Sequence, residues 1–305
     1  MFGRKIMAKL KLKNYIEILR PVNCIMGGFT VVIGFIISYN ELNFLSFIQN
    51  SSNIFLIISG FIIFFLVAGG TNTINDYFDY KIDQINRPNR TIPRGDITRK
   101  QSVQYYALLN ILALILAIIV GIITVNGFLI PFIVLFFEFI GFFYSWKGKA
   151  SGLPGNILVG IASAIGFPFA ALFFNKIREI PSLIWCIFIA TSIFLTSREF
   201  VKGMQDVKGD LEFKIKTIAN KFGYKTATIF MLIFSSIGAI LFTLLFFIFD
   251  LNIFYAIFAI IADIIVIFAN LLLIFNIYSP IKQRQASLLI KYAGVILILA
   301  LIFGY

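Results

Sequence analysis

A series of long apolar segments is the feature that most restricts what this chain can fold into. A helix that crosses a bilayer needs ~20 mostly apolar residues. The 305-residue sequence has about nine such stretches, roughly 22–39, 54–74, 104–124, 127–144, 155–174, 181–198, 226–249, 252–276 and 286–304. We therefore expect an all-α, polytopic membrane protein, with a single membrane-embedded domain over residues 1–305.

The composition supports this fold class and narrows the chemistry. The chain is 60% hydrophobic and 13% charged, whereas a soluble domain carries about 25% charged residues, so a soluble globule, a disordered tail and a fibrous protein are excluded. Histidine is absent, which removes the usual general base and the commonest transition-metal ligand. Cys24 and Cys186 lie in apolar runs, where cysteine is typically a small buried hydrophobe.

The basic residues are concentrated in every second segment between the spans, and these segments lie on one side of the membrane. Of the 26 Lys and Arg residues, 23 fall in five segments on one side, namely 1–21, 75–103, 145–153, 198–225 and 277–285. An excess of basic residues marks the cytoplasmic side. We therefore predict a cytoplasmic N-terminus, an external C-terminus and a basic interfacial helix at 5–19 within an N-terminal segment 1–21. The net charge of +12 mostly reflects this topology, and no soluble basic domain is present to bind nucleic acid.

The acidic residues gather in the two long segments 75–103 and 198–225, which we expect to be cytoplasmic loops of the active site. Each segment repeats acidic or amide side chains at four-residue spacing, Asn75, Asp79 and Asp83 in one and Asp206 and Asp210 in the other. Residues four apart share a helix face, where like charges repel. A divalent cation with oxygen ligands would neutralise them, and Mg²⁺ commonly joins carboxylates to phosphate oxygens.

The two acidic clusters are also related by a constant offset. Asp79 to Asp206 and Asp83 to Asp210 are both 127 residues apart, and each cluster follows a span. This pattern predicts two pseudo-repeated four-helix units around a central cavity, with a site where the units meet. Basic side chains near the clusters would complete a diphosphate site; these are Arg87, Arg90, Arg94, Lys202, Lys208 and Lys214.

These motifs resemble those of the UbiA-type superfamily of intramembrane prenyltransferases. The matching signatures are NDxxDxxxD at Asn75, Asp76, Asp79 and Asp83, and DxxxD at Asp206 and Asp210. Residues 89–95 are similar to a further family stretch, with Thr91 where proline is usual. The segments that contain Arg20 with Asn23, and Tyr144 with Lys147, are also similar to family segments.

The resemblance implies Mg²⁺-dependent prenyl transfer from an isoprenyl diphosphate, within membrane lipid. The implied metal ligands are Asn75, Asp76, Asp79, Asp83, Asp206 and Asp210. The implied catalytic residues are Asp79, Asp83, Asp206, Asp210 and Tyr144, the last because an aromatic face stabilises an allyl cation. The implied ligands of the diphosphate or of an acceptor phosphate are Arg20, Asn23, Arg87, Arg90, Arg94, Lys147, Lys202, Lys208 and Lys214.

Within the superfamily, the run from Arg198 to Asp210 is most similar to archaeal digeranylgeranylglyceryl phosphate synthases. That similarity implies transfer of a geranylgeranyl group from geranylgeranyl diphosphate to the glyceryl hydroxyl of geranylgeranylglyceryl phosphate, in ether-lipid biosynthesis. Arg20, Lys147 or Lys149 would then hold the acceptor's phosphate. Glu138 and Asp263 lie within spans and match no family position. No protein partner is implied.

Three other functions are compatible with parts of this pattern. An aromatic acceptor of the 4-hydroxybenzoate or naphthoate type would use the same donor site. A membrane transporter also has repeats and charged residues, although its sites tend to lie at the bilayer midplane. A CDP-alcohol phosphotransferase pairs aspartates on membrane helices, but its DGxxAR-type signature does not occur in this sequence.

Overall fold

The fold is a bundle of long helices, seen in a computed structural model that describes residues 12–39, 50–213 and 215–305. In the described part of the chain nine helical segments are long and apolar enough to cross a membrane. The helices are α2 (Pro21–Ser38), α4 (Ser51–Phe78), α5 (Tyr80–Asn86), α6 (Arg99–Ile123), α7 (Leu129–Trp146), α8 (Leu153–Ala164), α9 (Gly166–Ala171), α10 (Ser182–Glu212), α11 (Ile218–Ile248), α12 (Ile253–Ile274) and α13 (Pro280–Gly304). The predicted all-α membrane architecture is confirmed.

Helix packing places the two long acidic helices at the centre of the bundle. Helix α4 packs against α2, α6 and α7, and α10 packs against α8, α11 and α13. Helix α2 bridges the two groups through α9 and α13. Small residues allow close approach between helices. A Cβ atom at Gly160 on α8, for example, would lie 2.3 Å from the backbone oxygen of Ser192 on α10.

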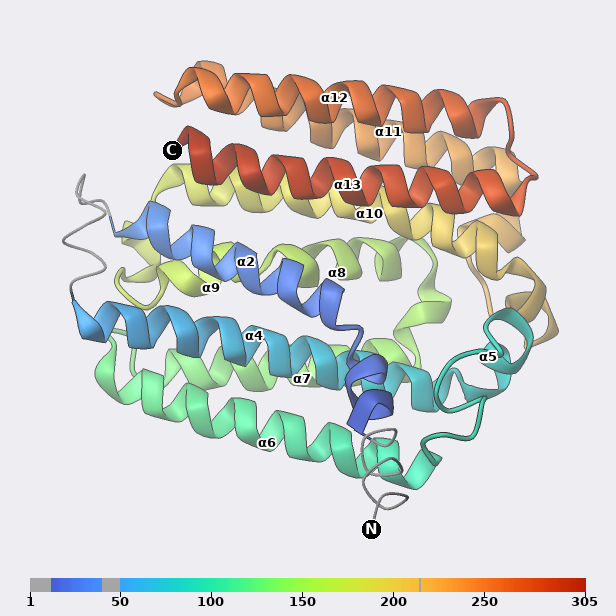
Figure 1. Cartoon of the computed structure of the whole chain (residues 1–305), viewed down its shortest axis with the longest axis horizontal. Coiled ribbons are helices and arrows are strands. Elements are labelled where there is room, and N and C mark those ends of the chain that lie inside the picture. The colour runs from blue at the N-terminus through green and yellow to red at the C-terminus, as the bar shows by residue number, and fades with distance from the viewer. Residues whose placement is uncertain (1–11, 40–49, 214) are drawn as a thin grey trace, which may run out of the picture.

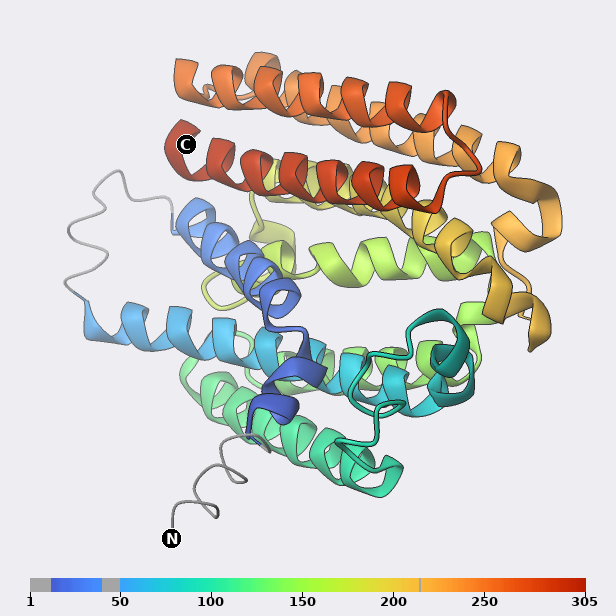
Figure 2. The ribbon, with the colours of Figure 1, turned by 45° about the vertical axis from the view of Figure 1, so that its right-hand side comes forward.

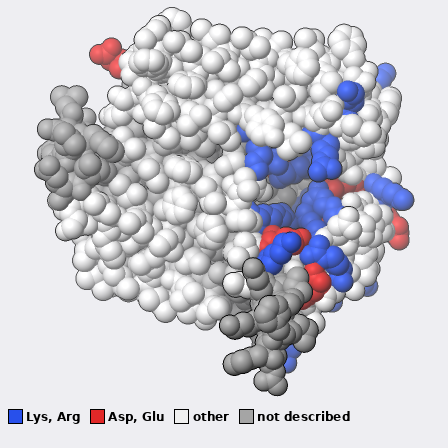
Figure 3. All heavy atoms as spheres, in the orientation of Figure 1, with Lys and Arg blue, Asp and Glu red and all other residues white. Residues whose placement is uncertain are grey.

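The outer surface is apolar and suited to lipid. Large hydrophobic side chains are exposed on the peripheral helices, among them Ile122 on α6, Phe247 on α11 and Ile264 on α12. Figure 3 shows a mostly uncharged face, with Lys, Arg, Asp and Glu gathered around a hollow towards the end of the bundle at which α5 lies. Because exposed apolar surface of this extent is unfavourable in water, the chain is a multi-pass membrane protein.

The segments expected to be loops are largely helical, which corrects one detail of the sequence prediction. Helix α10 continues to Glu212, so 198–212 is helix, and α11 begins again at Ile218. Similarly, α4 reaches Phe78 and α5 covers Tyr80–Asn86 within 75–103. Hydropathy detects where a chain leaves lipid. It does not detect where a helix ends, because a helix satisfies its backbone hydrogen bonds on both sides of that boundary. Of the predicted interfacial helix 5–19, residues 12–19 are helical and 5–11 lie outside the described residues.

The lengths of α4 and α10 explain how the acidic residues reach the site. These helices have 28 and 31 residues, more than the ~20 that cross the hydrocarbon core. Their C-terminal turns therefore extend beyond the apolar stretch and carry the acidic clusters. Helix α5 lies between these two ends and contacts both α4 and α10 (Figures 1 and 2).

Candidate active site

Residues of both acidic clusters line one cavity of about 590 Å³. The lining side chains come from α2, α4, α7, α8, α9, α10, α11 and α13 and from the segments that follow α5 and α7. Asp79 from the first cluster and Asp206 and Asp210 from the second share this wall with Asn75. Deeper residues, such as Phe137 on α7, are apolar. The cavity therefore joins a charged mouth to a hydrocarbon-like interior, as an amphiphilic substrate requires.

In the first cluster Asp76 and Asp83 are buried behind the cavity wall and held by arginines. Arg90 binds Asp76 at 3.0 Å and Asp83 at 2.5 Å, and Arg20 also forms an ion pair with Asp76. Burial raises the pKa of the Asp83 carboxyl to about 6, against the opposing effect of Arg90. These two aspartates therefore hold Arg20 and Arg90 at the edge of the cavity.

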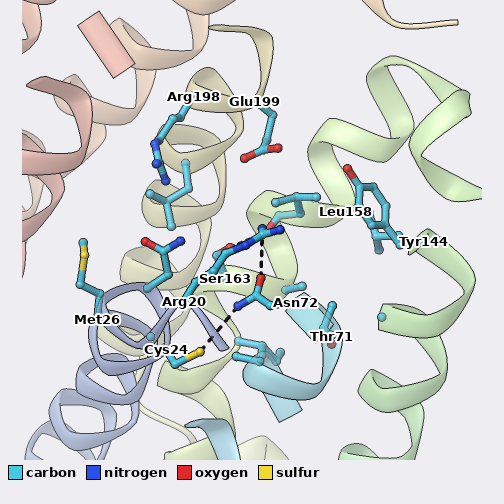
Figure 4. Close-up of a pocket in the computed structure, with 18 of the residues that line it drawn as sticks. Arg20, Cys24, Met26, Thr71, Asn72, Tyr144, Leu158, Ser163, Arg198 and Glu199 are labelled. Atoms are coloured by element: carbon cyan, nitrogen blue, oxygen red, sulfur yellow. Dashed lines mark hydrogen bonds between the residues drawn. The ribbon is translucent and has the colours of Figure 1, made fainter. Parts of the chain in front are cut away.

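Arg20 occupies an unusual backbone conformation at the junction between helix 12–19 and α2. Its φ of 55° and ψ of 60° lie in the left-handed region, which is uncommon for residues other than glycine. Pro21 follows and begins α2, and the residue before a proline is disfavoured in the α region. The strained turn directs the guanidinium towards Asp76 and Asn72, whose Oδ1 accepts at 3.4 Å (Figure 4).

Asp79 is paired from the other side of the cavity. Lys149, on the short turn Gly148–Ser151 after α7, donates to Asp79 Oδ2 at 2.9 Å. Burial lowers the pKa of Lys149, but Asp79 and Asp210 together outweigh that effect, so the pKa is raised. Lys149 is therefore a permanent positive charge beside the two acidic clusters.

The second cluster is neutralised less completely. Arg87 donates to both carboxylate oxygens of Asp206 at 2.8 Å, an ion pair between the two halves of the chain. Asp210 is only 1% exposed, and neither of its carboxylate oxygens accepts a hydrogen bond from any described residue. A buried carboxylate without hydrogen bonds is costly, so Asp210 has the capacity to bind a cationic ligand.

The carboxylates fit a divalent cation, although they form no ready-made metal site. Within the described ranges no three acidic, His or Cys side chains gather closely enough to hold an ion, because Arg and Lys side chains neutralise most of the acids. Asp79, Asp206 and Asp210 nevertheless line one cavity with the amide of Asn75. Oxygen donors of this kind suit Mg²⁺, and the unpartnered oxygens of Asp210 are the clearest sign of a missing positive charge.

Asn86 joins the two clusters and was not identified from the sequence. Its amide donates to the Asp206 backbone oxygen at 2.9 Å and accepts from the Gly209 backbone N–H at 2.9 Å. A Cβ atom at residue 209 would lie 2.6 Å from Asn86 Nδ2, so a glycine is needed there. Asn86 follows Asp83 by three residues, and this helical spacing is the signal that could have indicated it.

The other predicted residues divide into two groups. Arg20, Asn23, Arg87, Arg90, Lys202 and Tyr144 line the cavity. Arg94 is exposed and pairs with Glu17 and Asp96, Lys208 is exposed, and Lys147 is exposed with its Nζ 4.0 Å from the Trp146 ring centroid. These last three lie outside the cavity lining, and Lys214 lies outside the described residues. Sequence alone could not separate Arg94 and Lys208 from Arg87, Arg90 and Lys202, because all five are basic and close to a cluster.

The cavity also contains charged residues to which no role was assigned from the sequence. Arg198 and Glu199 on α10 project into it opposite Arg20 and Asn72 (Figure 4), and Lys291 on α13 reaches it as well. The intramembrane acids Glu138 and Asp263 do not line it. Asp263 accepts from Thr243 at 2.6 Å, which is a contact between α12 and α11.

Comparisons with known proteins identify relatives in sequence and in fold. The profile of the UbiA prenyltransferase family matches residues 28–295. Digeranylgeranylglyceryl phosphate synthase of Pyrococcus furiosus is 34% identical over 231 residues, which is 76% of each chain. A solved structure described as "Structural and mechanistic insights into the biosynthesis of Digeranylgeranylglyceryl phosphate synthase in membranes" is 28% identical, with a TM-score of 0.68 over 96% of this chain and 98% of that one. A UbiA homolog from Archaeoglobus fulgidus bound to GPP and Mg²⁺ shares the fold, at 21% identity and a TM-score of 0.59, over 93% of this chain and 99% of that one.

Proposed function

The chain belongs to the UbiA prenyltransferase family, and from that premise we propose that it transfers a geranylgeranyl group from geranylgeranyl diphosphate to the glyceryl hydroxyl of geranylgeranylglyceryl phosphate. The reaction forms a carbon–oxygen ether bond, breaks the carbon–oxygen bond to diphosphate and releases one proton. Its product is a membrane ether lipid. The observation that carries the proposal is the meeting of Asp79, Asp206 and Asp210 in one cavity that basic side chains also line.

We assign the metal to the carboxylates that face the cavity. Asp79, Asp206 and Asp210, with Asn75, would hold Mg²⁺. Asp76 and Asp83 do not line the cavity, and through their ion pairs they would instead position Arg20 and Arg90. When bound, Mg²⁺ supplies positive charge that neutralises the diphosphate as the carbon–oxygen bond breaks.

The chain's own cations contribute to the same stabilisation. Arg87, Arg90 and Lys149 line the cavity beside the carboxylates. Each keeps N–H groups beyond those that its carboxylate partners use, and charge-assisted hydrogen bonds from such groups to phosphate are strong. Negative charge that develops on the leaving group would then be met by donors that are already in position.

The apolar part of the cavity protects the allyl cation. Water would quench the cation, and residues such as Phe64, Phe137 and Phe194 exclude it from the deeper wall. The Tyr144 ring lies in the lining near the carboxylates, where its π face would stabilise positive charge on carbon. The acceptor hydroxyl loses its proton after it bonds to carbon, when a weak base suffices, so the absence of histidine is no obstacle.

The membrane orientation is part of the proposal. The five segments predicted to lie on the side of the acidic clusters carry 23 of the 26 basic residues, and such an excess marks the cytoplasmic side. The active site would therefore face the cytoplasm. The C-terminus of α13, at the end of the bundle away from α5 (Figure 1), would lie outside.

The test is an assay of the purified protein with Mg²⁺, geranylgeranyl diphosphate and either the glyceryl ether phosphate or 4-hydroxybenzoate, with products identified by mass. We expect product only with the lipid phosphate, and none in excess chelator. Asp79→Ala and Asp206→Ala should abolish transfer while the protein stays folded. An aromatic product alone would replace the proposed acceptor. Family membership already favours prenyl transfer over the transporter.

A further inference from the structure

Two basic side chains in the cavity form no ion pair with any acidic residue that the structure describes. Five of its cations form ion pairs with carboxylates, namely Arg20, Arg87, Arg90, Lys149 and Lys202. Arg198 on α10 and Lys291 on α13 also line the cavity, but neither forms an ion pair with any residue in the described ranges. Both lie in helices that cross the membrane, where an uncompensated charge is expensive.

Three helices bring these two cations to one part of the wall. Arg198 Nε donates to Ser287 Oγ at 3.3 Å, and Lys291 Nζ donates to Asn23 Oδ1 at 2.9 Å. Ser287 and Lys291 are four residues apart on α13 and therefore share a face, and α13 packs against both α10 and α2. A hydroxyl and two cations thus meet on the side of the cavity formed by α2, α10 and α13.

The nearest acid neutralises this group only in part. Glu199 follows Arg198 directly, but its carboxylate forms an ion pair with Lys202 on α10. Arg198, Lys202 and Lys291 together carry three positive charges against the single negative charge of Glu199, so the α2–α10–α13 wall keeps a net positive charge that an anionic ligand can balance. Two cations with a hydroxyl donor match the charge and the hydrogen-bonding capacity of a phosphate monoester.

We propose that Arg198 and Lys291, oriented by Ser287 and Asn23, bind the phosphate of the lipid acceptor at a second anion site. This inference rests on the proposed function, in which the acceptor is a phosphorylated lipid. It differs from the expectation that Arg20, Lys147 or Lys149 holds this phosphate, since Arg20 and Lys149 have carboxylate partners and Lys147 lies outside the cavity.

The position of the second anion site suits the geometry of the reaction. Arg198 precedes Asp206 by eight residues on α10, which corresponds to about 12 Å along the helix axis. The donor diphosphate would then bind near Asp206 and the acceptor phosphate near Arg198. The donor carbon and the acceptor hydroxyl that react would lie between these two anion sites. Beyond Lys291, α13 lines the cavity with Gly294, Leu297 and Leu301, an apolar surface for the acceptor's hydrocarbon chain.

The experiment measures binding without turnover. The full chain, purified in detergent with excess chelator and no donor, is titrated with geranylgeranylglyceryl phosphate, with the same lipid lacking its phosphate, and with inorganic phosphate as competitor. The variants are Arg198→Gln and Lys291→Met, with Arg198→Lys as the conservative replacement. Arg284→Gln is the matched control, because Arg284 is exposed on α13 and the same charge is removed.

We expect each charge-removing variant to weaken binding of the lipid phosphate by roughly tenfold or more, as loss of a charge-assisted hydrogen bond predicts. Binding of the phosphate-free lipid should be unchanged, Arg198→Lys should retain most of the affinity, and Arg284→Gln should match the original protein. Inorganic phosphate should compete with the lipid phosphate. The second anion site would be overturned if the variants bound the lipid phosphate as tightly as the original protein does. It would also be overturned if they lost the same affinity for the phosphate-free lipid as for the lipid phosphate.

The result separates this inference from the proposed function. If the original protein neither binds nor prenylates the lipid phosphate but prenylates an aromatic acid, the proposed acceptor is wrong. If it binds and prenylates the lipid phosphate, and the variants do so equally well, only the second anion site is wrong. Should both charge variants fail to fold, Ser287→Ala removes a single hydroxyl. A loss of about threefold in phosphate affinity would then support the site, and no loss would refute it.

Discussion

The two acidic clusters have the same spacing in sequence but different surroundings in the structure. In the first, Asp76, Asp79 and Asp83 each form an ion pair with an Arg or Lys side chain. In the second, Asp206 is paired with Arg87, whereas Asp210 is buried and accepts no hydrogen bond from any residue that the structure describes. Identical spacing therefore does not imply an identical role.

The difference shows which carboxylates are available to a ligand. An aspartate held by a buried arginine has its charge balanced already and mainly fixes the position of that arginine. An aspartate without a partner can balance an external cation. We therefore expect the carboxylates that line the cavity, above all Asp210, to control activity, and the buried Asp76 to control stability.

The largest effect is expected from Asp210→Asn. The change keeps the side-chain volume and removes a buried carboxylate that accepts no hydrogen bond from any described residue, so prenyl transfer should fall roughly 10²–10³-fold while stability stays close to that of the original protein. Initial rates across a Mg²⁺ titration, together with thermal unfolding in detergent, check both parts. Near-normal rates would contradict the assignment of Asp210 to the metal.

Asp76→Asn should have the opposite profile. It leaves Arg20 without its carboxylate, although Arg90 keeps Asp83, and breaking a buried ion pair typically costs roughly 3–5 kcal/mol. We expect a clear fall in the free energy of unfolding, measured by chemical denaturation in detergent beside Asp210→Asn. If Asp210→Asn proved the less stable of the two, the contrast between the clusters would be wrong.

Asn86→Ala tests the connection between the clusters. Losing its two bonds to α10 should loosen α5 against α10 and lower kcat roughly tenfold, because small displacements of catalytic groups are costly. KM for the acceptor should change little. Gly209→Ala should give a similar profile through its clash with Asn86. Steady-state kinetics with each substrate varied decide the matter, and a change in acceptor KM alone would point to a binding role instead.

The smallest effect concerns pH. The pKa of Asp83 is about 6 in the folded protein, above the ~3.9 of an unfolded aspartate. The folded state therefore binds this proton more tightly, and stability should fall as pH rises from ~4 to ~6, by on the order of 2 kcal/mol. The measurement is the free energy of unfolding as a function of pH, in excess chelator, for the original protein and for Asp83→Asn. The variant should lack the decrease in stability between pH ~4 and ~6, and an identical pH dependence in both proteins would contradict the prediction.

Much of the site could be predicted from the sequence because helical periodicity is local. Spacing of four residues identified Asp79, Asp206 and Asp210, and the 127-residue offset predicted that they meet in one place. Burial and partner choice are not local properties. Nothing near Arg94 or Lys208 in sequence shows that their side chains lie outside the cavity, and nothing near Lys291 shows that it faces inward.

The sequence by itself determined the membrane fold, its spans and the acidic clusters, because hydrophobic length and residue spacing act within one helix. Only the tertiary structure decided which charges neutralise one another. Asn86 reaches Gly209, Arg87 reaches Asp206 and Lys291 reaches Asn23 because separate helices pack side by side, and the free energy of an ion pair depends on distance and burial between segments that are remote in the chain.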